Sequence, residues 1–112
     1  MCIMKNKITI FFVFLLLFFG ERKFTEAQEV KILINEIAWM GTLNSSSDEW
    51  IELFNNASST ISLEGWTLSA TDGSPSINLQ GEITANGYFL LERTNDESVP
   101  NITASQIYTG AL

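Results

Sequence analysis

The stretch EWIELFN, Glu49 to Asn55, predicts a β-strand with one buried face. Its apolar residues Ile51 and Leu53 are two positions apart, and successive side chains of a strand point to opposite faces of a sheet. Glu52 lies between them and therefore belongs to the face opposite the core. The residues that share this second face are Trp50, Glu52 and Phe54.

Five further short runs are rich in β-branched, aromatic or alternating apolar residues. The turn pairs Asp72-Gly73 and Asn86-Gly87 lie among them. No run has the 3.6-residue period of an amphipathic helix. The sequence therefore predicts an all-β sandwich, with further strands within 30–39, 65–70, 77–83, 87–94 and 106–112.

The predicted core consists of the apolar residues that are in phase along these strands. Trp66 follows Gly65 and is in phase with Leu68, so it is assigned to the core. Replacing a core Trp with Ala should cost roughly 3–5 kcal/mol of stability. The residues predicted to be buried are Ile34, Ile37, Ile51, Leu53, Trp66, Leu68, Phe89 and Leu91.

The N-terminal residues 1–27 are predicted to be a signal peptide. Lys5 and Lys7 precede an apolar run from Ile8 to Phe19, and Ala27 is a suitable small residue for cleavage before Gln28. The run of 12 residues is shorter than the ~20 that a membrane-spanning helix requires. We therefore expect a secreted or cell-surface domain at residues 28–112, with retention of the segment as a membrane anchor as the alternative.

The composition of residues 28–112 excludes several classes of function. These residues include two cations and eleven acids and therefore carry a net charge of −9. Such a charge disfavours binding to nucleic acid or anionic lipid. The protein has no His, and its single cysteine, Cys2, lies in the signal segment. A histidine-based triad, a thiol nucleophile and a zinc site with His or Cys ligands are therefore impossible. We predict no enzyme activity, no cofactor and no small-molecule substrate.

Several segments resemble, in order and spacing, the bacterial lamin-tail domain. They are INEIAWMG, DEWIELFNN, ISLEGWTLSATDG, ITANGYFLLER and IYTGAL, between Leu33 and Leu112. The resemblance implies an immunoglobulin-like β-sandwich that serves as a non-catalytic interaction or tethering module. It also leaves open an accessory domain of a larger secreted hydrolase or nuclease. The motif residues that carry the resemblance, as structural or interaction residues, are Asn35, Glu36, Glu49, Trp50, Glu52, Asn55, Gly65 and Trp66.

The acidic residues around the central strand allow three interpretations. The favoured one is a solvated strand face; a partly buried hydrogen bond from Glu52 to a backbone N–H or to Lys31 is the second. A catalytic carboxylate pair is disfavoured, because a domain of this size offers little room for a substrate cleft. Acidic loops could also hold a structural calcium ion, and the oxygen ligands available are Asp48, Glu49, Asp72, Asn95, Asp96 and Glu97.

Two kinds of partner remain open, an unknown protein and a cell-surface glycan. A protein partner follows from the family resemblance. A glycan partner would stack its sugar rings on exposed tryptophans, and Trp39 and Trp50 are the candidates.

The end of the sequence predicts a domain without its last strands. The run 106–112 reads as a strand that has just begun, whereas an immunoglobulin-like sandwich typically has seven strands in ~100 residues. We therefore expect Leu112 beside an open sheet edge and incomplete covering of Tyr108 or its neighbours.

Overall fold

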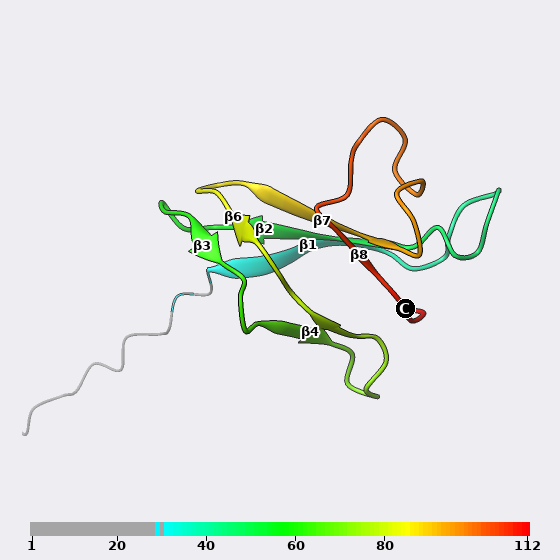
Figure 1. Ribbon diagram of the computed structural model, residues 1–112, viewed down its shortest axis with the longest axis horizontal. Helices are drawn as coiled ribbons and strands as arrows, with labels where there is room; N and C mark the ends of the chain where they lie inside the picture. Colours follow the sequence, from blue (N-terminus) through cyan, green and yellow to red (C-terminus); the bar gives the residue numbers. More distant parts are fainter. Residues whose placement is uncertain (1–28, 30) are drawn as a thin grey trace, which may run out of the picture.

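The computed structural model describes residue 29 and residues 31–112, so the predicted signal peptide lies outside the described residues. The described part is all-β, with eight strands and no helix, which confirms the predicted fold class (Figure 1). The strands are β1 (Ile32–Ala38), β2 (Trp50–Asn55), β3 (Ile61–Ser62), β4 (Thr67–Ser69), β5 (Ser76–Asn78), β6 (Glu82–Ile83), β7 (Tyr88–Arg93) and β8 (Gln106–Tyr108).

The first layer is a four-stranded sheet in the order β1-β2-β7-β8. β2 pairs antiparallel with both β1 and β7, whereas β8 joins β7 in parallel. The predicted strand at the centre of the sequence is therefore also central in the sheet. β1 and β8 form the two edges.

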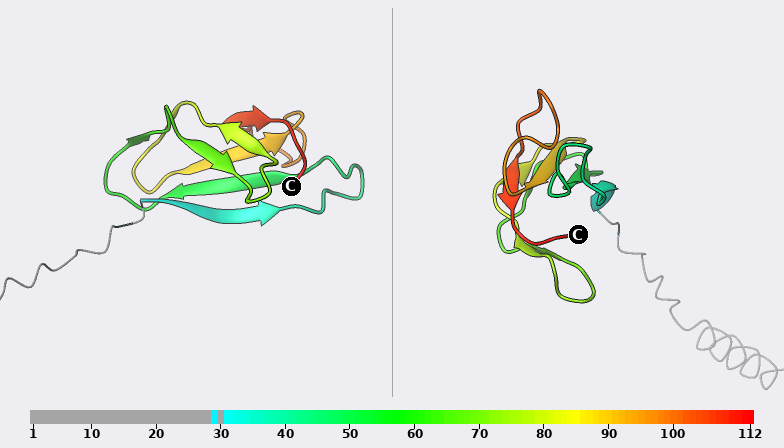
Figure 2. Two further views of the ribbon diagram at one scale, coloured as in Figure 1. Left: turned by 90° about the horizontal axis from the view of Figure 1, so that it is seen from below. Right: turned by 90° about the vertical axis from the view of Figure 1, so that its right-hand side faces the viewer.

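The second layer is a two-stranded ribbon that lies over the sheet (Figure 2). It contains the pairs β3–β6 and β4–β5, both antiparallel. Two backbone hydrogen bonds lie between these pairs, from Leu63 N to the oxygen of Gly81 at 2.8 Å and from Leu79 N to the oxygen of Trp66 at 2.9 Å. The two short pairs thus form one continuous ribbon, and the whole is a two-layer sandwich.

The core lies between the sheet and the ribbon. From the sheet, Ile51, Leu53, Phe89 and Leu91 are buried as predicted, and Leu68 packs against the cluster from the ribbon. The ribbon supplies core residues that the sequence pattern does not predict, because its strands are short and their apolar residues few. These residues are Leu63, Ile77, Leu79 and Ile83, and Tyr108 on the sheet strand β8 completes the core.

The assignment to the core is wrong for three residues. Ile34, Ile37 and Trp66 are 52%, 48% and 45% exposed. Ile34 and Ile37 do share the core face, since they pair across the strands with Leu53 and Ile51. They remain exposed because β1 is the sheet edge, and the two-stranded ribbon does not cover it.

The register of β1 shifts between Ile34 and Glu36, which marks a β-bulge at Asn35. Without this extra residue, Ile34 and Ile37 would point to opposite faces, because strand side chains alternate with a period of two. The bulge therefore places both isoleucines on the inner face of an edge strand.

The C-terminal expectation holds only in part. Tyr108 is buried at 4% exposure, whereas its neighbour Ile107 is exposed. Leu112 packs against the core beside the edge strand β1, in contact with the hollow that Ile34 and Ile37 line.

The side chain of Asn55 joins the two layers at one end of β2. Asn55 is fully buried, and its Nδ2 lies 2.8, 2.9 and 3.0 Å from the carbonyl oxygens of Ser59, Ile83 and Thr84. Its Oδ1 accepts a hydrogen bond from Ala57 N at 2.9 Å. One amide therefore satisfies backbone groups of the β2–β3 loop and of the end of β6.

Substitution of Asn55 by Asp should destabilise the domain strongly. The change removes the donor and sets a carboxylate against three carbonyl oxygens, so we expect a loss of at least about 3 kcal/mol in urea unfolding. The matched control is Asn56→Asp, which adds the same charge at the next, exposed position and should change stability by less than about 0.5 kcal/mol. Equal effects of the two substitutions would contradict the role assigned to Asn55.

Candidate functional site

The motif residue Glu49 is buried, contrary to the expectation of a solvated acid. Its Oε2 accepts hydrogen bonds from Arg93 Nη1 at 3.0 Å and from Leu112 N at 3.0 Å. The backbone supports the same contact, since Arg93 N donates to the oxygen of Glu49 at 2.9 Å. Glu49 therefore ties β2, β7 and the C-terminal residues together and is a structural residue.

Gly65 is required by the turn that precedes Trp66. Trp66 N donates to the oxygen of Leu63 at 3.0 Å, and Gly65, the third residue of this turn, has a φ of +82°. A type II turn needs a positive φ at that position, which glycine adopts without steric cost. Trp66, which follows this turn, lies in the wall of a surface hollow and is 45% exposed, so its assignment to the core fails. Its truncation to Ala should accordingly cost less than a core tryptophan does.

Glu52 lies on the face opposite the core, as predicted, and is half-buried there. Its donor is the bulge residue Asn35, whose Nδ2 lies 2.6 Å from Oε1, rather than Lys31 or a backbone N–H. Glu36 stands directly across from Glu52 in the strand register. The amide of Asn35 thus stabilises a carboxylate that faces a like charge.

A groove lies on this outer face, between β2, β7 and the loop 94–105. Trp50 and Tyr88 form its aromatic wall with Glu52 between them, and its volume is about 360 Å³. Tyr88 also contacts Phe54, with ring centroids 5.0 Å apart. We call this the outer groove; its lining residues on the loop are Val99, Ile102, Thr103 and Ser105.

The loop over the outer groove is held by Glu92, which the sequence analysis missed. Glu92 is fully buried and accepts hydrogen bonds from Ser98 N at 2.8 Å and Val99 N at 3.2 Å. An acid inside the apolar run GYFLLERT was the available signal, since a charge on a mostly apolar strand needs a partner.

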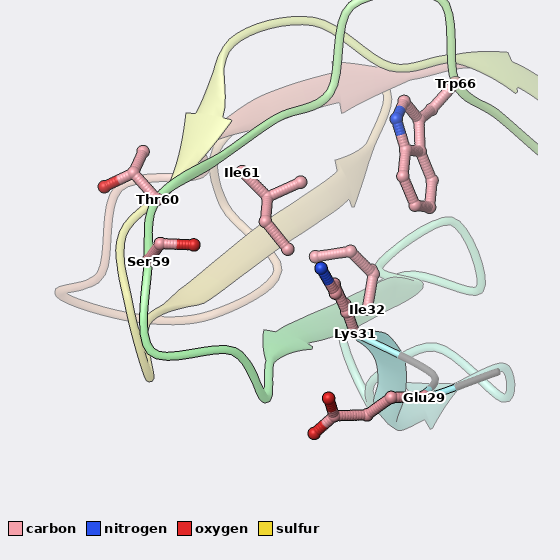
Figure 3. A pocket seen from close by; sticks show the side chains of 7 residues that line it. All are labelled: Glu29, Lys31, Ile32, Ser59, Thr60, Ile61 and Trp66. Carbon is pink, nitrogen blue, oxygen red and sulfur yellow. The ribbon is translucent and has the colours of Figure 1, made fainter. Parts of the chain in front are cut away.

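A larger hollow of about 820 Å³ lies beside the start of β1 (Figure 3). The side chains of Ile32 and Ile61 point toward one another across it, and Trp66 borders the same space. A smaller hollow of about 130 Å³ lies between Ile34 and Ile37 on β1 and Leu68 on β4. Because Ile32 and Ile34 lie on one face of β1, the two hollows follow one another along this strand; we call them together the β1 groove.

The acids of the loops make local hydrogen bonds. Asp48 accepts from the Thr42 hydroxyl, and Asp96 accepts from Ala104 N at 2.7 Å. Within residue 29 and residues 31–112, no three His, Cys, Asp or Glu side chains lie close enough together to hold a metal ion. The same residues contain no helix that could span a membrane.

The family model of the Lamin Tail Domain matches residues 25–110. The chain belongs to the lamin tail domain family. Its described part is an immunoglobulin-like β-sandwich, as that family's domains are, and the family is non-enzymatic. Searches of curated proteins and of solved structures return no match.

Membership of the lamin tail domain family suggests, at most, a non-catalytic interaction module. Of the eight motif residues, Glu49, Asn55 and Gly65 stabilise the fold, and Asn35 orients Glu52. Trp50 and Glu52 line the outer groove, and Trp66 lines the β1 groove. Glu36 is exposed at the sheet edge.

Substitution of Tyr108 by Phe should remove a loss of stability at high pH. Burial raises the pKa of Tyr108 to about 12, the Glu49 carboxylate adds to the rise, and Arg93 opposes it. A tyrosine of the unfolded chain ionises near pH 10, whereas Tyr108 of the folded chain stays protonated up to a higher pH. The free energy of unfolding is therefore unaffected by this group below pH 10 and falls by roughly 2–3 kcal/mol as the pH rises toward 12.

Urea unfolding between pH 7 and 12 measures this effect. The Tyr108→Phe variant should be at least as stable as the parent at pH 7, because the Tyr108 hydroxyl has no hydrogen-bond partner among the described residues. It should also show a smaller alkaline loss than the control variant Tyr88→Phe, whose ring is exposed. Equal alkaline losses in both variants would contradict the assignment.

Proposed function

We propose that this lamin tail domain is exported and acts as a non-catalytic module that binds a protein at the cell surface or outside the cell. One observation carries the proposal: within residue 29 and residues 31–112, six of the ten exposed large apolar side chains come from β1 and the loop after it. Exposed apolar side chains that are concentrated in one segment of a small domain are typical of an interaction surface. The six residues, which we call the β1 strip, are Leu33, Ile34, Ile37, Trp39, Met40 and Leu43.

The acidity of the domain supports a protein partner over a nucleic acid or a membrane. Arg93 is engaged with Glu49, which leaves Lys31 as the other cation of residues 28–112. A complementary partner is therefore apolar at its centre and basic around it, since charge complementarity speeds and orients association.

The export part of the proposal rests on the sequence of residues 1–27. N-terminal sequencing of the exported protein should give Gln28 as the first residue. A mature form that begins at Met1 and stays with the membrane fraction would instead favour an N-terminal anchor.

A glycan-binding module is the second candidate, and the outer groove favours it. Trp50 and Tyr88 offer aromatic rings, and Glu52 and Thr103 offer polar groups for hydroxyls. Aromatic walls with a few polar groups suit a sugar ring. Trp50 is half-buried and presents only part of its ring, whereas Tyr88 is exposed.

Two variants of the exported chain separate these candidates. Trp39→Ser combined with Met40→Ser alters the β1 strip, and Ile102→Ser alters the outer groove. We expect retention on immobilised cell-surface proteins to fall at least tenfold with the first change and to stay within twofold with the second. Binding to a glycan array that only Ile102→Ser weakens would support the second candidate and contradict the first.

A further inference from the structure

The β1 groove has the construction of a site for an added β-strand. Its floor is apolar, with Ile34, Ile37 and Ile51 on the sheet side and Leu68 on the ribbon side. At its other end it widens into the hollow bordered by Ile32 and Trp66. The groove therefore runs along β1, between the sheet and the ribbon.

The backbone of β1 is open on the side that faces this groove. Among residue 29 and residues 31–112, β1 pairs only with β2, and the ribbon strand β4 pairs only with β5. An edge strand presents a row of backbone N–H and C=O groups that can pair with another extended chain. β1 has seven residues, a length of about 24 Å at the usual rise of a strand.

The bulge at Asn35 places two apolar side chains of β1 where an added strand would contact them. It turns both Ile34 and Ile37 to the inner face, where they are half exposed. An added strand that pairs with β1 would place every second side chain on the same inner face, beside these two isoleucines. Those side chains would have to be apolar, and the alternate ones would point to solvent.

The net charge of the domain favours a basic added strand. Glu29 and Lys31 together line one end of the groove, and Glu36 lies on the outer face of β1. Residues 28–112 as a whole carry a net charge of −9. A basic segment is favoured by this field. A second copy of the chain would bring the same negative charge and is therefore disfavoured as the occupant.

We propose that the β1 groove binds an extended segment of another protein, with alternating apolar side chains between basic ends, as an additional strand beside β1. This inference rests on the proposed function as a protein-binding module and names its partner by chemistry. Backbone pairing gives the affinity, and the apolar floor and the net negative charge of the domain select the segment.

A labelled nonapeptide tests the proposal with the exported chain. Its residues alternate isoleucine or valine with threonine between terminal lysines. We expect saturable binding in fluorescence anisotropy and slower hydrogen exchange of β1 backbone amides in NMR spectra. Replacing the central residue of the peptide with proline, which cannot donate to a ladder, should weaken binding at least tenfold. Replacing both lysines with glutamates should also weaken it at least tenfold at low salt.

Two variants at opposite edges of the sheet provide the matched comparison. Ile37→Lys places a charge in the β1 groove, whereas Ile107→Lys adds the same charge on β8, the other edge strand. Both isoleucines are exposed, and thermal melting should confirm that both variants fold. Peptide binding should fall at least tenfold in Ile37→Lys and change less than twofold in Ile107→Lys.

Three results would overturn the inference: no peptide binding, equal effects of the two lysine variants, or self-association through β1 in sedimentation that Ile37→Lys abolishes. The last result would identify a second copy as the occupant. If the peptide fails but retention of cell-surface proteins still depends on Trp39 and Met40, strand addition is wrong while the proposed function stands. If both fail, the proposed function is wrong as well.

Discussion

The buried amide of Asn55 is the interaction on which the two-layer arrangement depends most directly. The domain has no disulfide, since its one cysteine is Cys2, and small exported domains commonly rely on such bonds. Buried hydrogen bonds of polar side chains provide part of that cross-linking here. Asn55 joins the end of β2 to Ser59 and to the β6 end of the ribbon, and Glu49, just before the other end of β2, joins Arg93 and Leu112.

The exposure of β1 follows from the different widths of the two layers. A two-stranded ribbon lies over a four-stranded sheet, and its apolar residues pack on the central strands β2 and β7. The inner face of β1 therefore lacks a complete cover, although its residues have the right phase to be core. Ile34 and Ile37 consequently form an exposed surface that is as apolar as a protein core. The same mismatch creates the β1 groove, so the candidate site is a consequence of the architecture.

The sequence predicts the phase of each strand better than it predicts burial. Alternation in EWIELFN places Ile51 and Leu53 inside and Glu52 outside, because it depends only on local backbone geometry. Whether an inner face is covered depends on the other layer, which explains the errors at Ile34 and Ile37. Trp66 fails for the same reason, since it is in phase with Leu68 but borders the open hollow beside the start of β1.

The buried acids show a second limit of local pattern. Glu49 meets Arg93 from 44 residues away, and Glu92 is covered by a loop that folds back over β7. Neither partner is indicated by spacing along the chain. Asn55 was identified through the family motif, but its three carbonyl contacts arise from two segments that only the folded chain brings together.

An open apolar edge strand requires protection against pairing between copies. Here the protection is electrostatic: Glu36 stands on the edge strand opposite Glu52, and Lys31 and Arg93 are the two cations of residues 28–112. The like charges cost stability across the β1–β2 pair, and the 2.6 Å contact from Asn35 to Glu52 offsets part of that cost. The same charges oppose the approach of a second acidic edge and favour a basic segment. The bulge and the isoleucines therefore leave an apolar edge, and the surplus of acids in residues 28–112, with Glu36 and Glu52 among them, sets the charge that an approaching chain meets.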